Sequence, residues 1–170
     1  MPHAMKNYFL HLLAVIFVTL AVVSCNTKST FTPGLRVLPV LHRTSAEGVQ
    51  DSVSIKDSLN IGDTVRMTMI VDGYFDYLQS VIARSDAEKV KVSLDWNDEQ
   101  MDMLSPDADL EHGKLLFVPM TVPACVTVLT YIPLVAGGHT ISIDITSSAQ
   151  APYSSNSWSF NIGVREDKLP

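Results

Sequence analysis

The sequence predicts an all-β fold, a β-sandwich of about seven to eight short strands. Beyond residue 34, apolar residues alternate with polar residues in one segment after another. That is the period of a strand with one buried face. Clusters of turn-forming residues separate these segments at the spacing typical of a sandwich.

The expected strands are residues 35–41, 53–55, 65–71, 90–96, 115–118, 125–132, 141–145 and 158–164. The clearest is 90–96, where Val, Val, Leu and Trp alternate with Lys, Ser and Asp. In residues 125–132, apolar residues occupy odd-numbered and even-numbered positions alike, which would point to opposite faces of a strand. We therefore expect a central strand that is covered on both faces. Trp96 and Trp158 share parity with the apolar residues of their own strands, which predicts that both pack in the core.

Turn chemistry lies between the predicted strands. The turns are expected at Asn60-Ile61-Gly62-Asp63, Asp72-Gly73, Ser105-Pro106-Asp107, Gly137-Gly138 and residues 151–157. One segment departs from the strand pattern, because Phe75, Leu78 and Ile82 stand at helical spacing. We therefore expect a short helix or a bulged strand over residues 75–82.

Two late segments carry a resemblance. Residues 133–141 read Pro-Leu-Val-Ala-Gly-Gly-His-Thr-Ile, and residues 158–164 follow a stretch rich in Ser and Asn. The first resembles the turn into a late strand of immunoglobulin-like domains, with His139 where such domains often carry Tyr. The second resembles their final hairpin. The resemblance implies an immunoglobulin-like sandwich over residues 35–166.

The N-terminal segment is apolar from Tyr8 to Val23 and ends in Val22-Val23-Ser24-Cys25, followed by polar residues. A transmembrane helix needs about 20 apolar residues, and this run has 16 with a His inside it. A secretory signal has a basic start, a shorter apolar region and a small-residue cleavage site. The tetrad resembles the lipobox of bacterial lipoproteins. Three interpretations stay open: a lipoprotein signal, ordinary secretion and a retained helix. The position of Cys25 favours the first.

The resemblance implies a division of the chain into segments and a cellular location. Residues 1–24 would be a signal peptide, and residues 25–34 would be a lipidated cysteine with a polar tether. The partner of Cys25 would be the membrane, through its acyl chains. Some Gram-negative anaerobes mark surface export with an acidic cluster after this cysteine, whereas here no acidic residue precedes Glu47. We therefore expect an outer-membrane lipoprotein that faces the periplasm, and the whole chain resembles small immunoglobulin-like lipoproteins of such organisms.

Charge and cysteine content limit the partners. The formal net charge is −6 and becomes −7 once the segment containing Lys6 is removed. An acidic domain argues against nucleic acid as a partner. The chain has two cysteines, so lipidation of Cys25 would leave Cys125 unpaired, and its apolar neighbours predict a buried, inert thiol.

The densest polar segment is acidic and spans residues 95–111. Asp107, Asp109 and Glu111 resemble the start of a calcium loop, since Ca²⁺ prefers oxygen ligands. However, His112 stands where that loop needs Gly, and Val118 stands where it needs a carboxylate. A solvated acidic loop is therefore the preferred interpretation, and no metal or other cofactor is predicted.

Function is predicted only by class. Tyr74, Tyr77 and Tyr153 lie in or beside expected turns and are the candidate ligand-binding residues. The histidines are too dispersed for zinc, and the common catalytic motifs are missing from the sequence. The leading hypothesis is a non-enzymatic, lipid-anchored binding or structural accessory module of the envelope. The alternative is a glycan-binding accessory lipoprotein of a polysaccharide uptake system, and a hydrolase is the third possibility.

Overall fold

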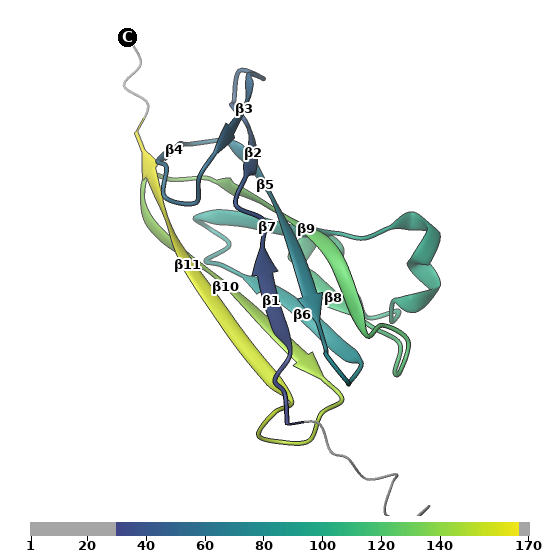
Figure 1. Ribbon diagram of the computed structural model, residues 1–170. Coiled ribbons are helices and arrows are strands. Elements are labelled where there is room, and N and C mark those ends of the chain that lie inside the picture. Colours follow the sequence, from purple (N-terminus) through teal and green to yellow (C-terminus); the bar gives the residue numbers. More distant parts are fainter. Residues whose placement is uncertain (1–29, 167–170) are drawn as a thin grey trace, which may run out of the picture.

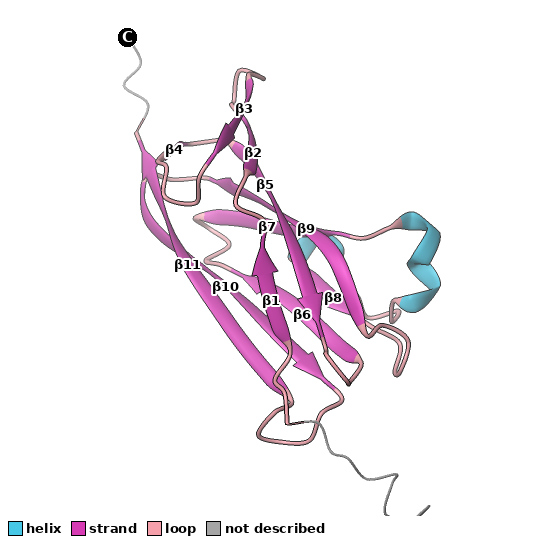
Figure 2. Cartoon of the chain, in the orientation of Figure 1, coloured by secondary structure: helices cyan, strands magenta, loops and turns pink. Residues whose placement is uncertain are grey.

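The computed structural model describes residues 30–166, which form two β-sheets packed as a sandwich (Figures 1 and 2). The first sheet contains β1 (Gly34–Val37), β2 (Leu41–Thr44), β3 (Gln50–Val53), β5 (Thr64–Asp72), β7 (Val90–Asp95) and β9 (Ala124–Pro133). The second contains β4 (Leu59–Asn60), β6 (Leu78–Arg84), β8 (Lys114–Leu116), β10 (Gly137–Ser147) and β11 (Ser155–Arg165). Two short 3-10 helices, η1 (Asp98–Met103) and η2 (Leu110–His112), link β7 to β8. The predicted signal peptide and Cys25 lie outside the described residues.

The strand order confirms the predicted fold class. The run β2-β5-β9-β7 matches the A-B-E-D sheet of immunoglobulin constant domains, and β11-β10-β6 matches their G-F-C sheet. β8 extends the second sheet beyond β6, and β4 pairs in parallel with β11. His139 is buried at the start of β10, and its Nε2 atom lies 2.8 Å from the carbonyl oxygen of Val135. This contact replaces the hydrogen bond that a corner tyrosine makes in such domains.

The core lies between the two sheets and is built from alternating residues. Val65, Met67, Met69 and Val71 of β5 are all fully buried. Leu129 and Tyr131 of the neighbouring strand β9 are buried on the same face of the first sheet. The buried residues of β10 in the second sheet are Ile141, Ile143 and Ile145. Both tryptophans are half-buried and pack against this core as predicted, at its edges.

The structure corrects the predicted burial of β9. Residues 125–132 were expected to be covered on both faces, but burial alternates along the strand and Val126 is 62% exposed. The outward face of the first sheet has no layer packed on it among the described residues. Apolar residues at both parities therefore did not indicate a doubly covered strand here.

The predicted helix over residues 75–82 is wrong, and the bulged-strand alternative is right. Residues 73–77 form a turn in which Tyr74 has a positive φ of 57°. β6 then starts at Leu78 and shifts register against β10 between Thr146 and Ser147. This bulge explains why Ser80 and Val81 are both buried, which breaks the alternation expected of a strand.

The described residues form more strands than predicted. The expected strand at 35–41 divides into β1 and β2, because Pro39 between them cannot donate a ladder hydrogen bond. β4 is also additional, whereas β6 is the bulged strand that was one of the two expectations for residues 75–82. Cys125 is buried and has no cysteine partner among residues 30–166, and burial raises the pKa of its thiol to about 12. Such a thiol is poorly reactive, in agreement with the prediction.

Candidate functional site

Three loops and the first described residues converge at one end of the sandwich, the lower end in Figure 1. We call it the loop end; it comprises residues 30–33, 73–77, 118–123 and 148–154. The antiparallel ladder brings them together, because Asp72 at the end of β5 pairs with Gly34 on one side and with Ala124 on the other. Tyr77 and Ser148 then join two of the loops, since the Ser148 N–H donates to the Tyr77 carbonyl oxygen at 2.8 Å.

Exposed aromatic rings cover part of the loop end. Phe31 lies with its ring centroid 5.8 Å from that of Tyr74 and 5.7 Å from that of Phe75. We call these three residues the aromatic patch. Phe31 and Tyr74 are each 51% exposed, and Phe75 is 81% exposed. Such a concentration of exposed rings is a typical mark of an interaction surface.

Backbone contacts hold the aromatic patch in place. The Tyr74 N–H donates to Asp72 Oδ1 at 2.6 Å, which fixes the left-handed turn. The Tyr74 ring lies over Gly34, where a β-carbon would come within 2.7 Å of the tyrosine hydroxyl. On the N-terminal side, Pro33 is buried and its carbonyl oxygen accepts a hydrogen bond from Asn156 Nδ2 at 2.9 Å. The contacts of the domain thus extend back into the predicted tether.

All three predicted tyrosines lie at the loop end. Tyr74 and Tyr153 are exposed, whereas Tyr77 is half-buried. Sequence reasoning missed Phe31 and Phe75, which make up most of the aromatic patch. A phenylalanine inside an otherwise polar tether was the available signal for Phe31. For Phe75, the helical interpretation hid the fact that its side chain points into solvent.

The acidic segment is dispersed in the structure. Asp107, Asp109 and Glu111 are all exposed, and no three acidic, histidine or cysteine side chains within residues 30–166 gather into a group that could hold a metal ion. Asp109 instead caps η2 by accepting the His112 N–H. Both of its carboxylate oxygens also lie 2.9 Å from His112 Nδ1.

The protonation states of Asp109 and His112 are coupled, and the coupling moves their two pKa values apart. The side-chain hydrogen bond to Asp109 raises the pKa of His112 above 6.5, and the same bond lowers the pKa of Asp109. The stability that His112 adds is therefore complete below pH 6.5 and is lost as the pH rises through its raised pKa. NMR titration should show that Asp109→Asn returns the His112 pKa toward its usual value. Glu111→Gln, which removes a less strongly coupled carboxylate, should change it less; equal effects would contradict the pairing.

An open groove lies beside η1 on the outer face of the first sheet. It is lined by Ile70, Trp96, Asn97, Gln100 and Val126, among others. The indole N–H of Trp96 donates to the carbonyl oxygen of Gln100 at 2.9 Å, so it is already engaged. The groove therefore offers a ring edge, two amide side chains and apolar surface to a partner.

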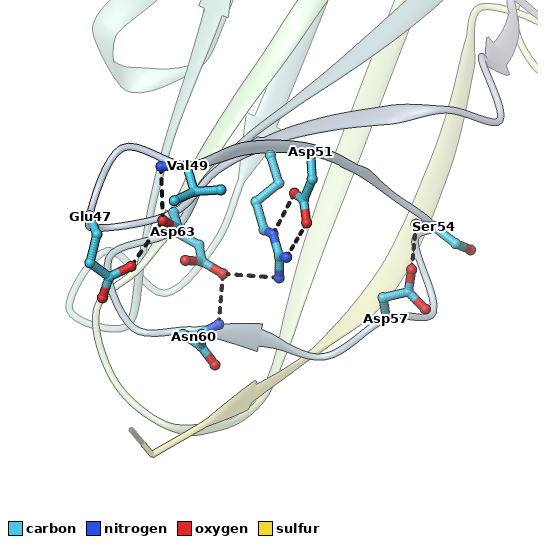
Figure 3. Close-up of polar contacts among 9 residues, drawn as sticks. Glu47, Val49, Asp51, Ser54, Asp57, Asn60 and Asp63 are labelled. Atoms are coloured by element: carbon cyan, nitrogen blue, oxygen red, sulfur yellow. Dashed lines mark hydrogen bonds and ion pairs between the residues drawn. The ribbon is translucent and has the colours of Figure 1, made fainter. Parts of the chain in front are cut away.

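The opposite end of the sandwich is held by charged side chains (Figure 3). Arg43 on β2 forms a two-pronged ion pair with Asp51 on β3 and lies 3.6 Å from Asp63. Asp63 is fully buried, and it accepts the Asn60 N–H at 2.9 Å. The hydrogen bond from Arg43 lowers the pKa of Asp51. This cluster fixes the β2–β3 hairpin to the turn before β5, so we assign it a structural role.

Comparisons with known proteins leave the family open. No family model and no curated protein matches the chain. One similar solved structure is a family 123 glycoside hydrolase from Clostridium perfringens, described in a study of glycolipid glycan hydrolysis. It aligns with a TM-score of 0.42 and 10% identity, over 80% of this chain and 27% of that chain. The chain thus spans about a quarter of that hydrolase, and a similarity this distant assigns no function.

Among residues 30–166, no helix is long and apolar enough to span a membrane.

Proposed function

We propose that this protein is a lipid-anchored, non-enzymatic module of the cell envelope that binds a partner or serves as a structural accessory. The observation that carries the proposal is where the chain enters the sandwich. The first described residues, 30–33, lie at the loop end, and Cys25 of the lipobox-like tetrad precedes them by only a few residues. An extended chain spans at most about 3.6 Å per residue. A domain acylated at Cys25 would therefore sit against its membrane.

This arrangement divides the surface of the domain. The loop end would face the membrane, while the β2–β3 hairpin and the end of β11 would point away from it (Figure 1). The groove beside η1 would open to the side. In the predicted outer-membrane location, a partner in the periplasm could then reach the end of the sandwich opposite the loop end, and the groove. The aromatic and amide side chains that line the groove suit a protein segment or a glycan.

Replacing Cys25 with Ser tests the anchor. The wild-type chain should sediment with the outer membrane, and Cys25→Ser should move to the soluble fraction, because acylation of the sulfur is no longer possible. Immunoblotting of fractionated cells measures the change. Cys125→Ser is the matched control and should stay in the membrane fraction, because that thiol is buried in the domain. Membrane retention of Cys25→Ser would mean that the apolar segment itself is the anchor.

Glycan binding is the second candidate function. The observation that favours it is that Tyr74 and Tyr153 expose their rings at the same end of the sandwich, on loops joined through Tyr77 and Ser148. Aromatic faces are a common support for sugar rings. Tyr74→Ala, Tyr77→Ala and Tyr153→Ala together should abolish retention on immobilised polysaccharides of the envelope or the growth medium. Val49→Ala, at the opposite end, should leave retention unchanged. Undiminished retention by the triple variant would reject this candidate.

A further inference from the structure

We propose that the aromatic patch rests in the lipid–water interface of the membrane that holds the protein and fixes the orientation of the domain. The inference rests on the proposed lipid anchor and adds a second, non-covalent membrane contact. Stable membrane attachment commonly combines two such signals. The structure supplies the geometry for the second one.

Proximity to the predicted anchor is the first argument. Phe31 follows Cys25 by six residues, a segment that reaches at most about 22 Å when fully extended. Phe31 also contacts Tyr74 and Phe75, so the β5–β6 turn is held about as close to Cys25 as Phe31 is. An acylated Cys25 would thus confine all three rings to the vicinity of the bilayer surface.

The chemistry of the patch is the second argument. Two phenyl rings and a phenol combine an apolar body with one polar hydroxyl, which is the composition that membrane interfaces favour. Two acidic residues flank Tyr74 and Phe75 in the chain: Asp72 Oδ1 accepts the Tyr74 N–H, and Asp76 Oδ1 accepts the Ser148 hydroxyl. They would oppose an anionic surface, and so the patch fits a zwitterionic lipid headgroup region.

A tryptophan placed at position 75 tests the inference in the full acylated chain. Phe75 is 81% exposed, so Phe75→Trp leaves the core untouched. The chain is reconstituted into dioleoylphosphatidylcholine vesicles with and without a brominated phosphatidylcholine, and the emission of wild-type Trp96 and Trp158 is subtracted. The added emission should shift to shorter wavelength and should be quenched by the brominated lipid.

Val49→Trp is the matched control. Val49 is 64% exposed and lies in the β2–β3 loop at the opposite end, so its added emission should resemble that of tryptophan in water and should stay unquenched. Equal quenching at both positions, or none at Phe75→Trp while the protein stays on the vesicles, overturns the inference but leaves the anchor intact. If instead the Cys25→Ser chain remains with the vesicles as fully as the acylated chain, acylation is not the anchor, and the inference that rests on it fails as well.

Discussion

Replacing Arg43 with Met should lower the free energy of unfolding by about 2–4 kcal/mol, a large share of the stability of a typical domain. The reason is Asp63, whose side chain is 1% exposed. Among residues 30–166, its Oδ1 atom has no hydrogen-bond partner. The guanidinium of Arg43 balances a carboxylate that water barely reaches, and without it this charge stays buried and unpaired. Urea unfolding of the soluble Cys25→Ser form, followed by tryptophan fluorescence, measures the loss.

Two further variants separate this effect from the simple loss of an arginine. Arg66 pairs with Asp95 at 2.6 Å, but the two side chains are 54% and 45% exposed. Arg66→Met should therefore cost less than about 1 kcal/mol. Adding Asp63→Asn to Arg43→Met should recover most of the loss, because a neutral amide needs no counter-charge. Similar losses for the two arginine variants would contradict the explanation.

The fold could be predicted because its signal is local. A strand with one buried face shows alternating apolar and polar residues over five or six consecutive positions, and burial alternates in this way along β5, β10 and β11. In β7, Val90 and Leu94 are buried, whereas Val92 and Ser93 are both half-buried. Burial of the other face is not a local property. Residues 125–132 looked doubly covered, although no element of the described chain packs on their outer side. Asp63 likewise looked like an ordinary turn residue, and its burial depends on the pairing of β2 with β5.

The candidate site could be predicted only in part for the same reason. The three tyrosines were found because turn residues are recognisable one at a time. The aromatic patch was not found, because Phe31 and Phe75 are distant in sequence and meet only through the pairing of Gly34 with Asp72. The helical spacing of Phe75, Leu78 and Ile82 also led to the wrong prediction of a helix, because a bulge in β6 imitates that period. Groups of side chains that come together only through strand register cannot be predicted from a single sequence.

Replacing Gly73 with Ala should destabilise the protein by about 3 kcal/mol and should act first on the loop end. A β-carbon at Gly73 would lie 2.4 Å from the carbonyl oxygen of Asp76 and 3.0 Å from that of Pro123. Both are backbone atoms, so relief requires the turn or the neighbouring loop to move. Moving the turn breaks the hydrogen bond from the Gly73 N–H to the Pro123 carbonyl oxygen, at 2.8 Å. Urea unfolding measures the loss, and NMR shifts of residues 73–77 report where it acts.

Gly138→Ala is the control for this prediction, because a β-carbon at Gly138 in β10 meets nothing within 4 Å. Its effect should stay within about 0.5 kcal/mol of the parent protein. The Gly73→Ala variant also bears on function, since the turn that would move carries Tyr74 and Phe75. If the aromatic patch orients the domain on the membrane, Gly73→Ala should weaken that orientation while acylation at Cys25 still holds the protein in the membrane fraction. A Gly73→Ala protein as stable as Gly138→Ala would show that the turn yields freely, and the loop end would then be too compliant to fix any orientation.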